Sequence, residues 1–225
     1  MENKRKIIER ITQIEWEMFV SVNEGEERAS CQEDRPSFEA MRFAQFETWP
    51  FDAVESYLGD LNAALSCGRN LVEEKYIHMM KSTEPSQYAA LLPRIRTPSE
   101  EAASLAHEVS DLMLEQTRLL FELYPYIAGH GRPLYSTFDY SGTSVETYQL
   151  GELLTYSEKT LMALKRYLTE PDSPGSTLAR DILENTIKHY GYESLETAEA
   201  ATKERIDKMG IQFTFGCCAG DDCEV

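Results

Sequence analysis

Ionisable side chains interrupt several apolar stripes that recur at helical spacing along the sequence. Glu15, for example, lies at the four-residue step between Ile11 and Phe19. A buried charge without a partner costs several kcal/mol, so such groups are usually paired inside a fold. We therefore expect a polar network within a helical bundle, drawn from Glu15, Arg42, Glu74, Lys75, Glu146 and Glu152.

Two kinds of chemistry suit these side chains. The first is binding of an anionic group, for which the candidates are Arg42, Gln45, Lys75, Arg132, Asp139 and Thr143. The second is proton transfer, because an apolar wall can raise the pKa of a carboxyl group toward neutrality. Its candidates are Glu15, Glu146, Glu152 and His130. The commoner alternative is an ion-pair cluster with a structural role alone.

Residues 124–143 form the longest stretch without helical periodicity, and they precede the helix that we predict over 144–168. Long irregular connections inside a domain are often functional. His130 lies between two glycines, which allow a backbone to approach a ligand closely. Arg132 suits a carboxylate or phosphate, and Thr143 or Ser144 caps the following helix. An ordinary surface crossover explains the same pattern.

Cysteines concentrate in the tail, where Cys217, Cys218 and Cys223 stand near two aspartates. Thiolates hold zinc or iron clusters, and Cys31 is a candidate fourth ligand. Adjacent cysteines are not the usual C-x-x-C spacing, so a terminus with incidental thiols is the alternative. A di-iron bundle site is disfavoured, because the chain has no Glu-x-x-His and offers only the weak pair of Glu74 and His78.

Helical periodicity dominates the rest of the chain. Helix start signals are Ser37, Asp52, Asn70 with Glu73, and Thr97 with Pro98. Gly151, inside one helix, allows another backbone to come near. Only residues 211–215 alternate like a strand. The predicted helices cover about 7–22, 37–48, 52–66, 70–84, 98–123, 144–168, 176–189 and 194–209, with a short piece near 86–92.

The sequence therefore predicts an all-α, multi-helix domain, orthogonal or bundle-like, over residues 1–210, followed by a cysteine-rich tail over 211–225. We expect about seven to nine helices, with a long loop between the two longest. A chain of 225 residues is long enough to bury a core without disulfides or metals.

Charge and composition exclude several classes of function. The chain carries 39 acidic and 22 basic residues, a formal net charge of −17. Such a surface repels phosphate backbones and anionic lipids, so nucleic-acid and membrane binding are not expected. The N-terminus lacks the apolar core of a signal peptide, and the five cysteines are an odd number. These features favour a cytoplasmic protein with reduced thiols. Motifs for nucleotide, dinucleotide and common hydrolase chemistry are absent.

Several stretches resemble a known family. They are IEWEMF at 14–19, FEAMRFAQF at 38–46, GRNLVEEKYIHMM at 68–80 and TSVETYQLGEL at 143–153, with Cys31-Gln32 between the first two. Together they are similar to a bacterial family catalogued as domain of unknown function 4125, over about residues 7–168. The resemblance implies a stand-alone cytoplasmic protein. Fusion of some members to a nucleotidyltransferase-like domain implies a transferase context. It implies no catalytic residues.

Three functions are compatible with the sequence. The first, which we favour, is an enzyme that binds a small polar or anionic metabolite among its helices, beneath the 124–143 loop. The second is a non-catalytic binding or regulatory module with a protein partner, such as a nucleotidyltransferase. The third is a metal- or redox-responsive protein that uses the tail cysteines. Convergence of the ionisable residues on one cavity would favour the first.

Overall fold

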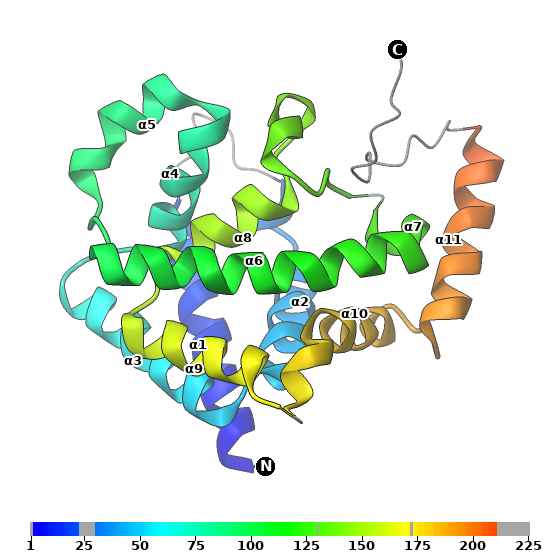
Figure 1. Ribbon diagram of the computed structural model, residues 1–225, viewed down its shortest axis with the longest axis horizontal. Coiled ribbons are helices and arrows are strands. Elements are labelled where there is room, and N and C mark those ends of the chain that lie inside the picture. Colours follow the sequence, from blue (N-terminus) through cyan, green and yellow to red (C-terminus); the bar gives the residue numbers. More distant parts are fainter. Residues whose placement is uncertain (1, 23–29, 130, 172, 211–225) are drawn as a thin grey trace.

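The computed structural model describes residues 2–22, 30–129, 131–171 and 173–210 (Figure 1). These residues form helices and connections without strands, which confirms the all-α prediction. The helix count in this part of the chain exceeds the predicted seven to nine. The α-helices are α1 (Glu2–Val20), α2 (Arg35–Thr48), α3 (Phe51–Ser66), α4 (Leu71–Thr83), α5 (Pro85–Leu91), α6 (Glu100–Leu123), α7 (Pro125–Ala128), α8 (Val145–Leu153), α9 (Glu158–Thr169), α10 (Leu178–His189) and α11 (Leu195–Met209). The 3-10 helices are η1 (Ser30–Gln32), η2 (Leu92–Arg94), η3 (Ser136–Ser141) and η4 (Pro174–Thr177).

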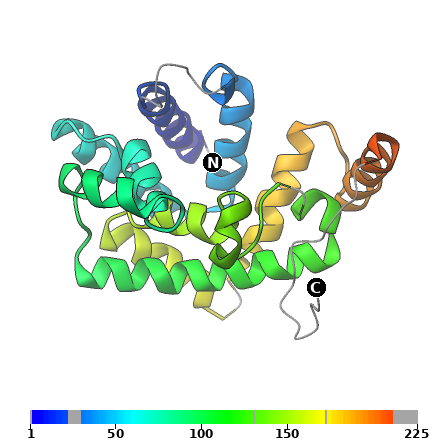
Figure 2. The same cartoon turned by 90° about the horizontal axis from the view of Figure 1, so that it is seen from above.

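The longest helix, α6, runs along one side of the molecule (Figures 1 and 2). Helices α8, α9 and α10 pack against it. Figure 2 shows α1 and α2 on the opposite side. Helix α1 packs against α2, α3 and α4, while α4 also packs along α8. This arrangement places α8 between the N-terminal helices and α6.

A single large core joins most of these helices. Its fully buried side chains are those that recur at helical spacing in the sequence, as the periodicity predicts. Trp49, which follows α2, is 1% exposed and packs edge-on against Phe46 and Tyr156. The largest fully buried side chains include Ile8, Ile11, Ile14, Phe46, Trp49, Leu61, Leu161, Leu164 and Leu178.

Several helices start one to three residues from their predicted caps. Helix α2 begins at Arg35, because Asp34 accepts a hydrogen bond from the backbone N–H of Ser37 at 3.1 Å. Helix α3 follows Pro50, so Asp52 is not its cap. Helix α6 is capped by Ser99, not by Thr97. The cap at Asn70 is confirmed, since its side chain accepts from the N–H groups of Val72 and Glu73.

The prediction of one continuous helix over 144–168 is wrong, because two helices, α8 and α9, occupy this range. Residues 154–157 separate them, and Ser157 caps α9. Asp60 of α3 stabilises the break: its Oδ2 accepts from the backbone N–H of Ser157 at 3.0 Å and from the hydroxyl of Thr160 at 2.7 Å. The apolar period continues across the break because both helices pack on α6.

The connection over 124–143 is less irregular than predicted. It contains α7 and η3, and it leads into the short helix α8 rather than into one of the two longest helices. Ser144 is the N-cap of α8. Asp139 ties the connection to that helix, because it accepts from the N–H of Ser144 at 2.8 Å and from the hydroxyl of Thr147 at 2.7 Å.

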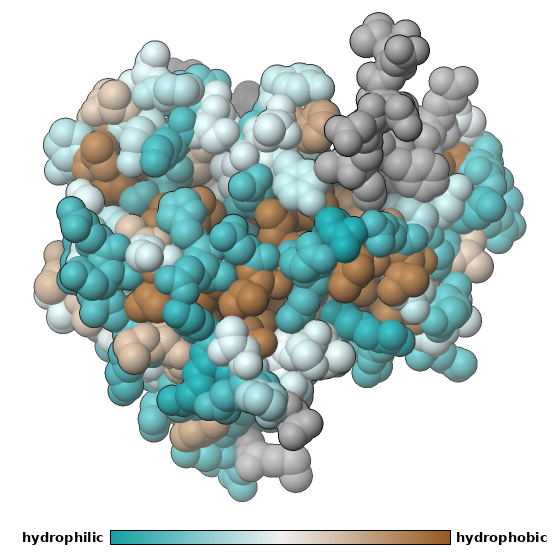
Figure 3. All heavy atoms as spheres, viewed as in Figure 1, coloured by the Kyte–Doolittle hydropathy of each residue, from teal (hydrophilic) through white to brown (hydrophobic). Residues whose placement is uncertain are grey.

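Hydrophilic residues dominate the face shown in Figure 3, and apolar residues gather mainly along α6. Leu119 and Leu123 of that helix are 46% and 65% exposed. Among the described residues, no helix combines the length and apolar character needed to cross a bilayer.

Candidate functional site

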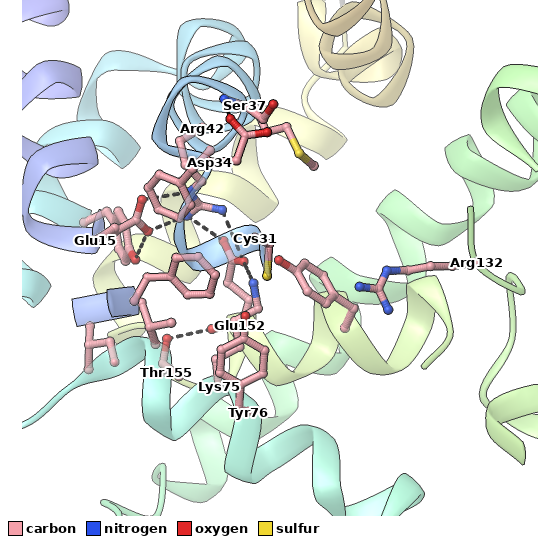
Figure 4. Close-up of a pocket in the computed structure, with 17 residues that line it drawn as sticks. Glu15, Cys31, Asp34, Ser37, Arg42, Lys75, Tyr76, Arg132, Glu152 and Thr155 are labelled. Atoms are coloured by element: carbon pink, nitrogen blue, oxygen red, sulfur yellow. Dashed lines mark hydrogen bonds and ion pairs between the residues drawn. The ribbon is translucent and has the colours of Figure 1, made fainter. Parts of the chain in front are cut away.

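Four helices bring ionisable side chains from distant parts of the sequence to one point in the interior. Glu15 comes from α1, Arg42 from α2, Lys75 from α4 and Glu152 from α8 (Figure 4). These four side chains, here termed the ion cluster, are each at most 11% exposed. Their predicted convergence is therefore observed, and their charges are largely removed from water.

Arg42 lies at the centre of the ion cluster. Its Nε donates to Glu15 Oε2 at 2.7 Å, and its Nη2 donates to Glu15 Oε1 and to Glu152 Oε1. Its Nη1 donates to Gln45 Oε1 at 3.0 Å and to Glu152 Oε2 at 3.3 Å. A guanidinium has five N–H donors, and these five hydrogen bonds occupy all of them. Arg42 therefore holds the two carboxylates in place and has no donor left for a ligand.

Glu152 joins the two cations. Its Oε2 accepts from Lys75 Nζ at 2.6 Å, in addition to the bonds from Arg42. Gln45 Nε2 donates to Oε1 of the same carboxylate at 3.3 Å. With two carboxylates against two cations, the ion cluster is electrically balanced, which is the condition under which buried charges are tolerated.

The sequence predicts Glu152 as a candidate for proton transfer, which calls for a pKa near neutrality. Burial alone would raise the pKa of this carboxyl group, but the charges of Arg42 and Lys75 outweigh that effect and hold the pKa well below its ordinary value of 4.5. Burial would also lower the pKa of Lys75, yet the adjacent Glu152 carboxylate raises it. Glu152 therefore stays ionised and Lys75 stays protonated at neutral pH.

Two buried tyrosines complete the ion cluster, and the sequence analysis missed their role. The Tyr57 hydroxyl donates to Glu15 Oε1 at 2.7 Å, and the Tyr156 hydroxyl donates to Glu152 Oε1 at 2.6 Å. Burial and the neighbouring carboxylates raise the pKa of both phenols well above 10.0, so both remain donors. A tyrosine in an apolar stripe resembles any other core aromatic, so the sequence carries no signal for this role.

A cavity of about 280 Å³ opens beside the ion cluster (Figure 4). Lys75 and Glu152 of the ion cluster line this cavity together with Tyr148, and all three come from the packed pair α4 and α8. The volume lies just under the ~300–1,000 Å³ typical of ligand pockets. Its lining comprises Glu15, Phe19, Cys31, Asp34, Ser37, Phe38, Met41, Arg42, Tyr57, Leu71, Val72, Lys75, Tyr76, Arg132, Tyr148, Glu152 and Thr155.

Two cations meet the ring of Tyr148 on the wall of this cavity. Lys75 Nζ lies 3.5 Å from the ring centroid, and the guanidinium carbon of Arg132 lies 4.8 Å from it. Arg132 comes from the connection over 124–143, as predicted for a residue that reaches the site. Its Nη1 donates to the carbonyl of Thr143 at 3.0 Å, and among the described residues it forms no ion pair.

Other residues predicted for the site lie outside the cavity lining. Glu146 accepts a hydrogen bond from the backbone N–H of Ser136 at 2.7 Å, which anchors η3 to α8. Asp139 holds the start of α8 in the same way, and Thr143 contributes only its carbonyl, to Arg132. These residues position the segment that carries Arg132. His130 lies outside the described residues.

Glu74 does not join the ion cluster either. Its carboxylate pairs with Arg69, whose Nε donates to Glu74 Oε1 at 2.8 Å. His78, one turn further along α4, is 6% exposed and its Nε2 has no hydrogen-bond partner among the described residues. Burial lowers the pKa of His78, so it is neutral at neutral pH.

The predicted metal site falls outside the described residues, because Cys217, Cys218 and Cys223 all belong to 211–225. The strand-like segment 211–215 lies there too. Within the described residues, no group of three or more His, Cys, Asp or Glu side chains is arranged to hold a metal ion. Cys31 and Cys67 are free, exposed thiols, and Cys31 lines the cavity.

Close packing of α4 on α8 depends on Gly151. A Cβ at this position would lie 2.7 Å from Met79 Cγ and 3.0 Å from the backbone oxygen of Lys75. Gly151→Ala is therefore expected to lower the free energy of unfolding by about 1–3 kcal/mol, because the added methyl group overpacks the contact. Urea denaturation measures this loss.

Gly59→Ala is the matched control, because a Cβ there, in the middle of α3, would meet no atom within 4 Å. We expect it to raise the free energy of unfolding by about 0.5–1 kcal/mol, since alanine favours a helix over glycine. Equal effects of the two substitutions would contradict the close approach of α4 and α8.

The fold and the site define an all-helical protein with a charge-balanced ion cluster beside a cavity. A family model described as "protein of unknown function (DUF4125)" matches residues 5–200, which is most of the chain. The chain belongs to this family, and the resemblance seen in the sequence is confirmed. No curated protein and no solved structure matches the chain. The matched range contains the whole ion cluster. Because the description of the family gives no function, the evidence for a function comes from the geometry of the site.

Proposed function

We propose that this protein binds a small organic anion in the cavity beside the ion cluster. The observation that supports the proposal most directly is the pair of cations on the Tyr148 ring. Lys75 uses one of its three N–H donors on Glu152, and Arg132 uses Nη1 on a backbone carbonyl. Both side chains line the cavity and keep donors for a ligand. A carboxylate or phosphate is the group that such donors favour.

The charges around the cavity support the same proposal. The ion cluster is balanced, so Arg132 adds a positive charge to one side of the lining. Asp34 adds a negative charge on the α2 side, where Figure 4 shows it apart from Arg132. That carboxylate is already used to cap α2. An anion placed next to Arg132 and Lys75 therefore meets donors from two cationic side chains, and among the described residues Arg132 has no carboxylate partner.

Binding, rather than acid–base catalysis, is the role that we propose for the site. The pKa of Glu152 lies far below neutrality, and Arg42 engages both carboxylates of the ion cluster. The ion pairs of the cluster therefore hold the Lys75 side chain in place beside the cavity. We further propose a cytoplasmic location, which the exposed free thiols of Cys31 and Cys67 support.

Arg132→Ala tests the proposal. We expect this change to weaken the binding of an organic anion at least about tenfold, because a hydrogen bond to a charged group contributes about 1.5–3 kcal/mol. The melting temperature of the free protein should change little, since Arg132 is exposed. The measurement is the thermal shift produced by a panel of carboxylates, sulfonates and phosphomonoesters, with native mass spectrometry to detect any anion that co-purifies.

Arg10→Ala is the matched control. Arg10 is an exposed arginine of α1 outside the cavity lining, so its loss changes the net charge equally without touching the site. The proposal predicts that the control binds the same anions as the unmodified protein. Equal weakening by both substitutions would show a general charge effect, and the absence of any bound anion from the panel and from the purified protein would overturn the proposal.

A further inference from the structure

The cavity has an apolar side that the anion-binding residues do not account for. Phe19 and Phe38, from α1 and α2, stack with ring centroids 5.3 Å apart and planes 11° apart. Met41 of α2 and Val72 and Tyr76 of α4 continue this surface. A ligand that covers these side chains removes apolar area from water, which stabilises a complex. This side of the cavity therefore favours a ligand whose uncharged part is apolar rather than polar.

The charged side of the cavity limits the charge that a ligand can carry. Arg42 has no free donor, and Lys75 is already neutralised by Glu152. Arg132 is thus the one cation of the described lining without a carboxylate partner. A second or third negative charge on the ligand would lie near the buried carboxylates of Glu15 and Glu152 without a compensating cation, and this repulsion disfavours polyanions.

Size leads to the same class of ligand. A cavity of about 280 Å³ is small for a nucleotide or another large polyanion. It can hold a compact molecule with one charged end. Lys75 and Arg132 contact the ring of Tyr148 in α8, whereas the stacked rings of Phe19 and Phe38 come from α1 and α2. The lining therefore offers different surroundings to the two ends of such a molecule.

We infer that the ligand is an amphiphilic monoanion: a carboxylate or equivalent single-charge head at Arg132 and Lys75, with a compact aromatic or aliphatic body against Phe19, Phe38 and Val72. This inference rests on the proposed function and names the class of anion that the site takes. It distinguishes the site from one built for a di- or triphosphate.

Cys31 makes the inference testable on the unmodified protein. It lines the cavity, whereas Cys67, the other exposed free thiol of the described residues, does not. The rate of alkylation by iodoacetamide, followed at each cysteine by peptide mass spectrometry, therefore reports occupancy at Cys31 and carries its own reference at Cys67. Four probes distinguish the contribution of the ligand's charge from that of its apolar part. They are 3-phenylpropionate, its neutral amide 3-phenylpropionamide, acetate and citrate.

We expect 3-phenylpropionate to slow alkylation of Cys31 about tenfold when it is present at about ten times its dissociation constant. Acetate, which lacks the body, and citrate, which carries several charges, should protect Cys31 only at far higher concentrations. The amide should also bind more weakly than the acid. In every case the rate at Cys67 should stay unchanged.

Other outcomes overturn specific parts of the argument. Protection by citrate at lower concentration than 3-phenylpropionate would overturn the inference but leave the proposed anion site intact. Equal protection by 3-phenylpropionamide and 3-phenylpropionate would show that charge is irrelevant, and both the inference and the proposed function would fall. Absence of protection by all four probes would overturn the inference, while the search for a co-purified anion would decide the proposed function separately.

Discussion

Replacing Arg42 with alanine is expected to lower the free energy of unfolding by about 3–5 kcal/mol, because the change leaves buried carboxylates without their central cation. Glu15 is 2% exposed and receives its remaining hydrogen bond from Tyr57 alone. Glu152 keeps Lys75 and Tyr156, so most of the loss comes from Glu15. Urea denaturation at neutral pH, extrapolated to water, measures the change.

Arg5→Ala controls for the loss of an arginine as such. Arg5 pairs with Glu9 on the exposed face of α1, and exposed pairs contribute at most about 1 kcal/mol. A variant of Arg42 that unfolds at the same urea concentration as the unmodified protein would show that Glu15 needs no cation. That result would return Arg42 to the ligand-binding role that its position in the sequence suggests.

The second large effect is expected from Glu152→Gln, which keeps the shape of the side chain but removes its charge. We expect a loss of about 3 kcal/mol or more at pH 7, because the ammonium group of Lys75 then lies buried without a carboxylate. The amide group of glutamine also turns a donor toward the donors of Arg42 and Lys75. Denaturation by urea across a range of pH gives the size of this loss and its pH dependence.

The contribution of Glu152 to the free energy of unfolding depends on pH with a definite sign. The pKa of Glu152 in the folded protein lies well below its ordinary value of 4.5. Its contribution to stability is therefore fully present above that value and is lost as the pH falls through the folded pKa, because the unfolded chain binds the proton first. The stability difference between the unmodified protein and Glu152→Gln should shrink below about pH 4.5.

Glu204→Gln serves as the comparison for Glu152→Gln. Glu204 is an exposed residue of α11 that pairs with Lys208, so its replacement should change stability by less than about 0.5 kcal/mol at any pH. A constant difference between Glu152→Gln and the unmodified protein from pH 7 to pH 3 would contradict the assignment of Glu152 as an ionised carboxylate held by cations.

The sequence predicts the helical architecture well because most helices are amphipathic. The apolar residues of α1 and α9 recur at helical spacing, and their buried members fall on that stripe. The boundaries are predicted less well, because several residues near a start can act as caps. Ser99 and Asp34 cap their helices in the structure, although the sequence also offers Thr97 and Ser37.

The split between α8 and α9 could not be predicted from periodicity. Apolar residues keep their spacing through the break, because both helices pack on α6. The break depends on Asp60, which lies 97 residues before Ser157 in the chain and accepts from its backbone N–H. A hydrogen bond between such distant residues is a tertiary contact, and local sequence carries no information about it.

The ion cluster was predictable because charged residues in apolar stripes must find partners. Glu15, Arg42, Lys75 and Glu152 come together as expected. The expectation fails for Glu146, which binds a backbone N–H, and for Glu74, which pairs with Arg69. For Glu152 the sequence prediction considers only the apolar wall, which would raise the pKa, and not the charges of Arg42 and Lys75, which lower the pKa. The sequence shows that a carboxylate is buried, but only the structure shows that two cations touch it.

The wide spacing of the ion cluster along the chain also constrains how the protein is made. Arg42 binds Glu15 across 27 residues, but Lys75 and Glu152 are 77 residues apart. On the ribosome, the first helices emerge long before α8 and can satisfy only the Glu15–Arg42 pair. Burial of Lys75 without Glu152 would leave its charge unpaired, so we expect Lys75 to remain hydrated until Glu152 is available. We therefore expect the interior around Lys75 to close only after α8 has been added to the N-terminal helices.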